Sequence, residues 1–197
     1  MRKLLLIPFL LLGATSNALN NKKLNSYFES FLPHQTFILS PMSPSNPATL
    51  RHQYEQAAAN KEAGEKFYDL LHGYKGQEAL VLGYKAASEA IKARDASMLN
   101  KLTYVQQAAR TFEQAVALDP ANAEIRFLRF SVESNLPPFL GLSKHVDEDK
   151  AFLLAAALQH PRSGLDDEAF RTVRGFLVGR GHVSEAQAEQ LAQVKSS

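Results

Sequence analysis

Along most of this chain apolar side chains recur every three to four positions, with charged and amide side chains between them. This spacing puts the apolar groups on one face and is typical of amphipathic helices. No segment has the alternating pattern of a strand, so the sequence predicts an all-α fold. The expected helices cover 47–73, 76–94, 98–118, 122–135, 147–159 and 166–179, and a last helix opens at Ser184. Within 98–118 the inward positions are Leu102, Val105, Ala109, Phe112 and Val116.

Short capping signals support several of these boundaries. Asn46 followed by Pro47 is typical of a helix start, because asparagine caps the first turn and proline suits the first helical position. Ser184 and Gln187 have the spacing of a capping box. Small residues on the inward face of 76–94 indicate that a neighbouring helix approaches closely.

The first residues have the layout of a secretory signal peptide. The basic pair Arg2 and Lys3 precedes an apolar run over 4–12, and a stretch of small and polar residues then ends at Ala18. The apolar run is about half of the roughly 20 residues that a membrane span needs. A signal peptide over 1–18 is therefore favoured over a retained anchor, and we expect an exported protein, periplasmic or secreted.

A connection over 19–47 is expected to join this signal to the helical domain. Apolar residues at helical spacing predict a short helix over 21–32. Four prolines then forbid a regular helix and indicate an extended segment, in which 37–39 lies against the body of the protein. One all-helical domain is expected over 48–197.

Composition narrows the classes of function. The chain has 22 Lys+Arg and 20 Asp+Glu, and loss of Arg2 and Lys3 with the signal leaves equal numbers of each. No basic cluster supplies the face that nucleic acid requires. The chain has no cysteine, which excludes disulfides and an acylated cysteine anchor. No later segment reaches transmembrane length, so no membrane span is expected in the mature chain.

The sequence contains no recognisable motif for catalysis, for a cofactor or for a metal ion. No catalytic residue, cofactor or metal ligand is therefore predicted. The six histidines include no pair at the i, i+4 spacing of a helical metal site, although a site assembled by folding stays open. No GxSxG elbow and no glycine run for a phosphate occur. The acidic groups over 147–149 and 166–168 fall at expected helix starts, where the helix dipole accounts for them.

One segment, AARTFEQAVALDPANAEIRF, carries Ala108, Phe112, Ala115 and Pro120. It resembles the second helix of a tetratricopeptide repeat and the turn that follows it, a motif with small, aromatic, small and proline residues at this spacing. The resemblance covers about 20 residues, without a sustained 34-residue period. It implies antiparallel helical hairpins, with a tetratricopeptide-like core over about 76–135 and additional C-terminal helices. The block 125–150 is also similar to exported bacterial helical proteins of unknown function.

The candidate binding region is the helix over 122–135 and the loop after it. Arg126 and Arg129 are neighbours on one helical face, close to aromatic residues and to the apolar loop 139–142. Two arginines in this setting suit a carboxylate-bearing peptide. The alternative is that they pair with Glu133, Asp147 or Asp149 and fix the loop. The candidate partner-binding residues are Arg126, Arg129, Phe130, Phe139 and Leu140.

Two classes of function follow. The first is a periplasmic protein–protein interaction or scaffold protein, whose partner is a protein or peptide of the cell envelope. The second is a small envelope enzyme or a helical protein that binds a small ligand. A concave apolar groove would favour the first class, and a deep closed pocket with a buried carboxylate or histidine would favour the second.

Overall fold

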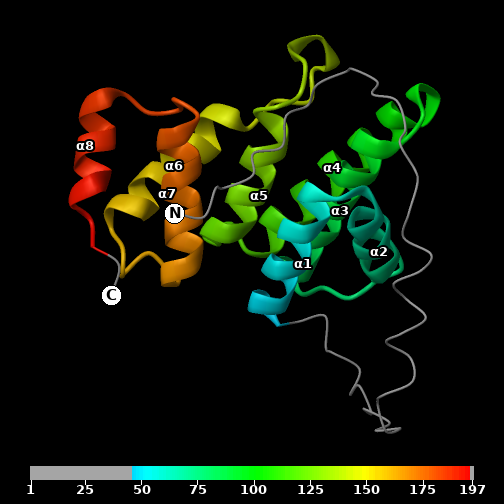
Figure 1. The fold of residues 1–197 in the computed structure, drawn as a ribbon, viewed down its shortest axis with the longest axis horizontal. Coiled ribbons are helices and arrows are strands. Elements are labelled where there is room, and N and C mark those ends of the chain that lie inside the picture. Colours follow the sequence, from blue (N-terminus) through cyan, green and yellow to red (C-terminus); the bar gives the residue numbers. More distant parts are fainter. Residues whose placement is uncertain (1–45, 196–197) are drawn as a thin grey trace, which may run out of the picture. The chain divides into compact units, whose positions relative to one another are not determined.

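The computed structural model describes residues 46–195, which contain eight α-helices and one 3₁₀ turn (Figure 1). The all-α class is confirmed, since no strand occurs within this range. The signal over 1–18, the short helix over 21–32 and nearly all of the proline-rich connection lie outside the described residues. The elements are α1 (Pro47–Ala59), α2 (Lys61–Leu71), α3 (Ala79–Asp95), α4 (Met98–Leu118), α5 (Ala123–Glu133), η1 (Pro138–Leu140), α6 (Val146–Leu158), α7 (Asp167–Gly179) and α8 (Glu185–Gln193).

The single helix predicted over 47–73 is wrong, because Asn60 divides it into α1 and α2. Asn60 is extended, with φ −140° and ψ 133°, and its side chain accepts a hydrogen bond from the Ala63 amide at 3.0 Å. One residue therefore ends α1 and caps α2. Asparagine can do this because its short polar side chain competes for backbone groups.

The other capping signals are present in the structure. Asn46 accepts a hydrogen bond from the Thr49 amide at 3.3 Å, and Pro47 is the first residue of α1. Ser184 and Gln187 form the reciprocal hydrogen bonds of a capping box at the start of α8. These local signals fix the helix starts without help from the rest of the fold.

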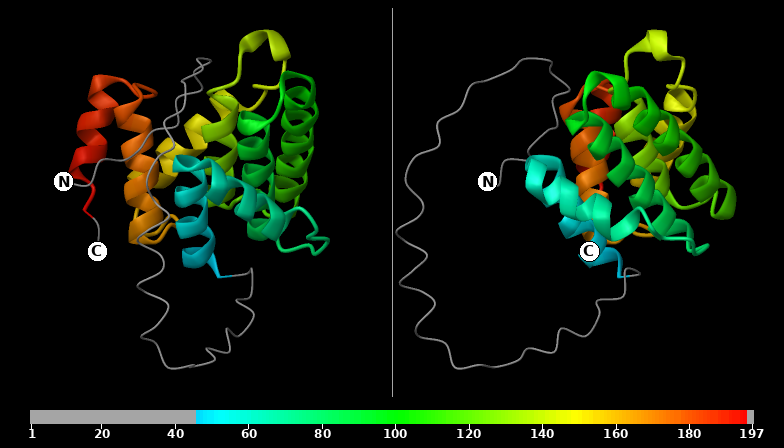
Figure 2. Two further views of the ribbon diagram at one scale, coloured as in Figure 1. Left: turned by 45° about the vertical axis from the view of Figure 1, so that its right-hand side comes forward. Right: turned by 90° about the vertical axis from the view of Figure 1, so that its right-hand side faces the viewer.

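Helix α5 lies between two hydrophobic cores (Figures 1 and 2). Leu128 packs into the core formed by α1 to α4, whereas Phe127 and Phe130 pack into the core formed with α6, α7 and α8. A third, smaller cluster joins Ile125 of α5 to Leu82 of α3 and Ala115 of α4. Most of the surface of α5 is therefore buried, including its two arginines.

The small residues of α3 allow this close packing, as the sequence indicated. A Cβ atom added at Gly83 would meet Ile125 Cγ1 of α5 at 3.3 Å. At Gly64 of α2, an added Cβ would meet Ile91 Cγ2 of α3 at only 2.9 Å. Glycine lets α3 approach helices on two sides.

The residues of the repeat-like segment are placed in the interior. Ala108, Phe112 and Ala115 are all buried on α4, and Pro120 lies in the turn before α5. Phe112 contacts the core shared with Leu128. A tetratricopeptide-like arrangement of the hairpins stays a prediction. Among the described residues, no helix is both long and apolar enough to cross a membrane.

Candidate functional site

The two candidate arginines form a buried ion cluster with α6. Arg129 donates to both Asp149 carboxylate oxygens, from Nε at 2.7 Å and from an Nη at 2.7 Å. Arg126 reaches the same carboxylate at 2.9 Å and Glu148 at 2.6 Å. The Asp149 side chain is 0% exposed, so one carboxylate without access to water serves two guanidinium groups.

Several further contacts hold Arg126 in place. Its Nε donates to the Pro120 carbonyl at 2.7 Å, and its guanidinium lies 4.5 Å from the centre of the Phe152 ring. Burial by itself would lower the pKa of Arg126, but hydrogen bonds to Glu148 and Asp149 outweigh it and raise the pKa. The hydrogen bond from Arg126 also lowers the pKa of Glu148. Arg126 therefore stays charged inside the fold.

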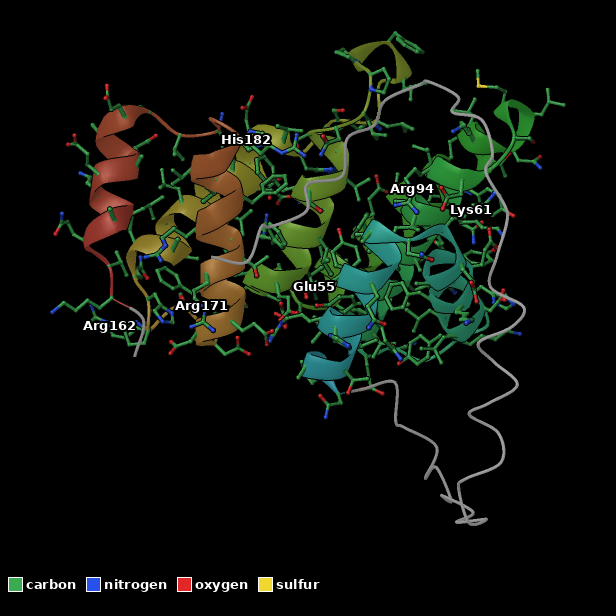
Figure 3. All side chains as sticks on the ribbon, in the orientation of Figure 1. Glu55, Lys61, Arg94, Arg162, Arg171 and His182 are labelled. Carbon is green, nitrogen blue, oxygen red and sulfur yellow. The ribbon has the colours of Figure 1, made fainter. Side chains whose placement is uncertain are left out.

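Of the candidate residues, Arg126, Arg129 and Phe130 lie in the interior. The arginines pair with Asp149, as one of the two interpretations expected, and with Glu148, which it did not name. Glu133 instead bonds to His145. Phe130 is fully buried, with ring centres 5.7 Å from Phe176 and 4.8 Å from His182, which is labelled in Figure 3.

The remaining candidates, Phe139 and Leu140, lie on η1, in a loop that is fixed at its base. Glu133 Oε2 accepts a hydrogen bond from the His145 amide at 2.8 Å. Ser143 Oγ donates to the Glu133 carbonyl at 2.8 Å. Gly141 ends η1 with φ 63°, a conformation that glycine adopts without strain. Leu140 is partly exposed, and the Phe139 side chain is 85% exposed.

The first turn of α4 carries a second group of exposed apolar side chains. Met98, Leu99 and Leu102 are 73%, 90% and 46% exposed. The inward position predicted for Leu102 is wrong. The buried face of α4 runs through Val105, Ala108, Phe112 and Ala115, so Leu102 lies at the edge of this face.

These two groups lie at the same end of the helical unit. Figures 1 and 2 show η1 and the connection between α3 and α4 at the upper end in every view. We call Met98, Leu99, Leu102 and Phe139 the apolar end. The sequence singled out Phe139 from its apolar loop. The three α4 residues were missed because their spacing is that of an ordinary inward face.

A second network, which the sequence did not indicate, ties four helices together. Arg51 of α1 forms a paired contact with both Glu124 oxygens at 2.9 Å and an ion pair with Asp166 at 2.8 Å. The Tyr84 hydroxyl donates to Glu124 at 2.5 Å. Burial and the Glu124 carboxylate raise the pKa of Tyr84. Arg51, Glu124 and Tyr84 are largely buried, while Asp166 is 57% exposed at the edge of the network. Because these side chains bond to one another across helices, we assign the network a structural role.

Glu89 of α3 is a buried carboxyl group with few hydrogen bonds to replace those that it would make with water. Its Oε1 accepts a hydrogen bond from Gln107 at 2.9 Å, while Oε2 is buried without a hydrogen-bond partner. Burial raises the pKa of Glu89, and the nearby side chains of Thr111 and Gln107 oppose this only in part. Folding at neutral pH therefore has a free-energy cost, because the charged form of Glu89 is removed from water.

Replacing Glu89 with glutamine is expected to stabilise the protein increasingly as the pH rises. The native pKa is above the unfolded value of 4.5, so wild-type stability is complete below about pH 4.5 and falls as pH rises through the native pKa. Glu89→Gln removes this loss, so its advantage over wild type should be larger at pH 7 than at pH 4. Urea unfolding of both proteins at several pH values measures the difference. An unchanged difference between pH 4 and 7 would show that Glu89 is not the responsible group.

Comparison with known proteins gives no family for this chain. No protein-family model, no curated protein and no solved structure matches it. Within residues 46–195, no group of three or more histidine, aspartate or glutamate side chains is arranged to hold a metal ion. The apolar end is thus the feature of the described residues that the packing of the fold leaves unexplained.

Proposed function

We propose that this chain is an exported helical scaffold or interaction protein of the cell envelope, which docks through its apolar end. The signal-like layout of 1–18 and the tetratricopeptide-like segment of α4 support the location and the class. The observation that carries the proposal is the exposure of four large apolar side chains from two separate segments at one end. Several large apolar side chains left exposed at one end of a fold are a candidate binding surface.

The loop around η1 is well suited to binding because its conformation is fixed beforehand. Glu133 and Ser143 close the base of the loop by hydrogen bonds, so Phe139 is presented with little freedom to lose. A contact residue that is already ordered loses less entropy on binding. Aromatic side chains also contribute a large share of interface energies.

The buried ion cluster supports this surface from inside the fold. Arg126 and Arg129 join α5 to α6, and the loop with η1 connects these two helices. The arginines thereby set where the loop begins and ends. In this proposal they position the contact surface, and Phe139 and Leu140 make the contact.

Photocrosslinking in cells that produce the protein tests the proposal. A photoreactive amino acid is placed at Leu99, at Phe139 or, as a control, at Leu118, which is also exposed but lies at the other end of α4, about 28 Å away. We expect adducts of the same mass from 99 and 139 and none from 118. Equal labelling at all three positions, or no adduct at 99 and 139, would contradict the proposal.

A further inference from the structure

The charges around the apolar end are unusually one-sided. Acidic residues make up 20 of the 197 residues of the chain, but none occurs in 96–112 or in 134–146. These two segments contain the whole apolar end. Their charged side chains are Lys101, Arg110 and Lys144. The two segments that form the docking surface therefore combine exposed apolar groups with basic side chains only.

Three of the acidic groups that flank these segments are paired with a cation or turned inward. Asp95, at the end of α3, pairs with Arg94 at 2.6 Å, and Arg94 also donates to the Ala58 carbonyl of α1 at 2.7 Å (Figure 3). Glu133 is buried and bonded to His145. The next acidic residue after η1, Asp147, pairs with Lys150 at 3.0 Å. These pairings reduce the negative charge near the lysines at this end, where the Asp147 side chain is still 93% exposed.

The other end of the unit has a different character. Glu124, Asp166 and Glu168 surround Arg51 there, and Arg171 also lies at this end (Figure 3). Charges of both signs occur together, mostly in ion pairs. The unit is thus polarised, with an apolar and basic end opposite an end of mixed charge.

The form of the apolar end points to the kind of surface that it fits. Its side chains project from two separate supports, a 3₁₀ turn and the first turn of a helix, rather than from one continuous face. A bound peptide or helix needs a continuous groove or stripe of contacts. A bilayer accepts separate apolar projections at its interface, because the acyl boundary adapts to each of them.

We infer that the apolar end binds the surface of an anionic phospholipid bilayer. This inference rests on the proposed function, because it names the partner of the same docking surface. Phe139, Met98 and Leu99 enter the boundary between headgroups and acyl chains, while Lys144 and Lys101 meet lipid phosphates. The Lys101 amine lies at the end of α3, where it donates to the Arg94 carbonyl at 2.7 Å, beside the first turn of α4.

Vesicle flotation tests the inference with the full chain in the form in which cells process it. Vesicles of phosphatidylglycerol and phosphatidylethanolamine are compared with vesicles of phosphatidylcholine alone. We expect binding to the anionic vesicles that weakens as salt is added. Leu99→Ser combined with Phe139→Ser should lower this binding about tenfold or more, since two large apolar groups no longer leave water.

Matched variants separate the apolar and electrostatic contributions. Leu118→Ser with Leu158→Ser removes two exposed apolar groups elsewhere, at the C-terminal ends of α4 and α6, and should leave binding unchanged. Lys144→Glu should weaken binding to the anionic vesicles about fivefold or more and leave binding to phosphatidylcholine unaffected. Arg162→Glu, at an exposed position far from the apolar end (Figure 3), should change neither. Circular dichroism establishes that each variant is folded.

The outcomes distinguish this inference from the function on which it rests. Equal vesicle binding by wild type and Leu99→Ser/Phe139→Ser overturns the inference, since contact would then lie outside the apolar end. If wild type does not bind vesicles but crosslinks from 99 and 139 to a protein, the lipid partner is refuted and the scaffold proposal stands. Without vesicle binding or crosslinks, both fail.

Discussion

Replacing Asp149 with alanine is expected to lower the free energy of unfolding by about 3–5 kcal/mol. The Asp149 carboxylate accepts hydrogen bonds from Arg126 and Arg129 and is fully buried. Its removal leaves two buried guanidinium groups without their shared counter-charge, and Glu148, which bonds to Arg126 at 2.6 Å, can compensate only in part. Urea unfolding followed by circular dichroism measures the loss.

Asp147 provides the control for this substitution. It also lies in the first turn of α6, but its side chain is 93% exposed, so Asp147→Ala removes the same helix-dipole interaction without uncovering a buried charge. We expect a loss within about 0.5–1 kcal/mol. If Asp149→Ala proves as mild as Asp147→Ala, the cluster does not hold α5 against α6. Replacing Asp149, Arg126 and Arg129 together by apolar residues should recover much of the stability, because no charge then stays buried.

Replacing Phe130 with alanine is expected to cost about 3–5 kcal/mol of unfolding free energy. Its ring is fully buried in the core of α5 to α8, against Phe176 and His182, and the smaller side chain would leave a cavity there. Phe139→Ala makes the same chemical change at an exposed position and should alter stability by less than about 0.5 kcal/mol. Thermal and urea unfolding of both variants give the comparison.

The same pair of variants separates packing from binding. Phe139→Ala should weaken contact at the apolar end while the protein stays as stable as wild type. Phe130→Ala should be unstable, and at a temperature where it is still folded it should bind normally. A stable Phe130→Ala protein with defective binding would instead support the sequence-based view of Phe130 as a contact residue.

The helices could be predicted from the sequence because their signals are local. The helix expected over 98–118 has the bounds found for α4, and the capping signals at Asn46 and Ser184 act within one turn. The break between α1 and α2 at Asn60 was not predicted, because it has no comparable signal in the apolar pattern. Apolar spacing continues across it, and only the extended backbone of Asn60 separates α1 from α2.

The site was predicted less completely because burial depends on contacts between distant segments. The arginines of α5 appear in the sequence as a polar face, and only packing on both sides of this helix shows that they are interior. The exposure of Leu102 likewise depends on which face of α4 its neighbours cover, and the apolar spacing of α4 alone does not give this. Phe139 was identifiable from sequence because its loop is apolar without helical spacing.

The position of α5 also determines how this protein can unfold. The chain cannot be divided into two segments that each contain one complete core, because residues of α5 pack into both cores. Opening either core exposes apolar surface on the helix that the other core requires, so the two halves lose stability together. We therefore expect the helices of residues 46–195 to unfold as one cooperative unit, with the amides of α5 exchanging with solvent only when the whole unit opens.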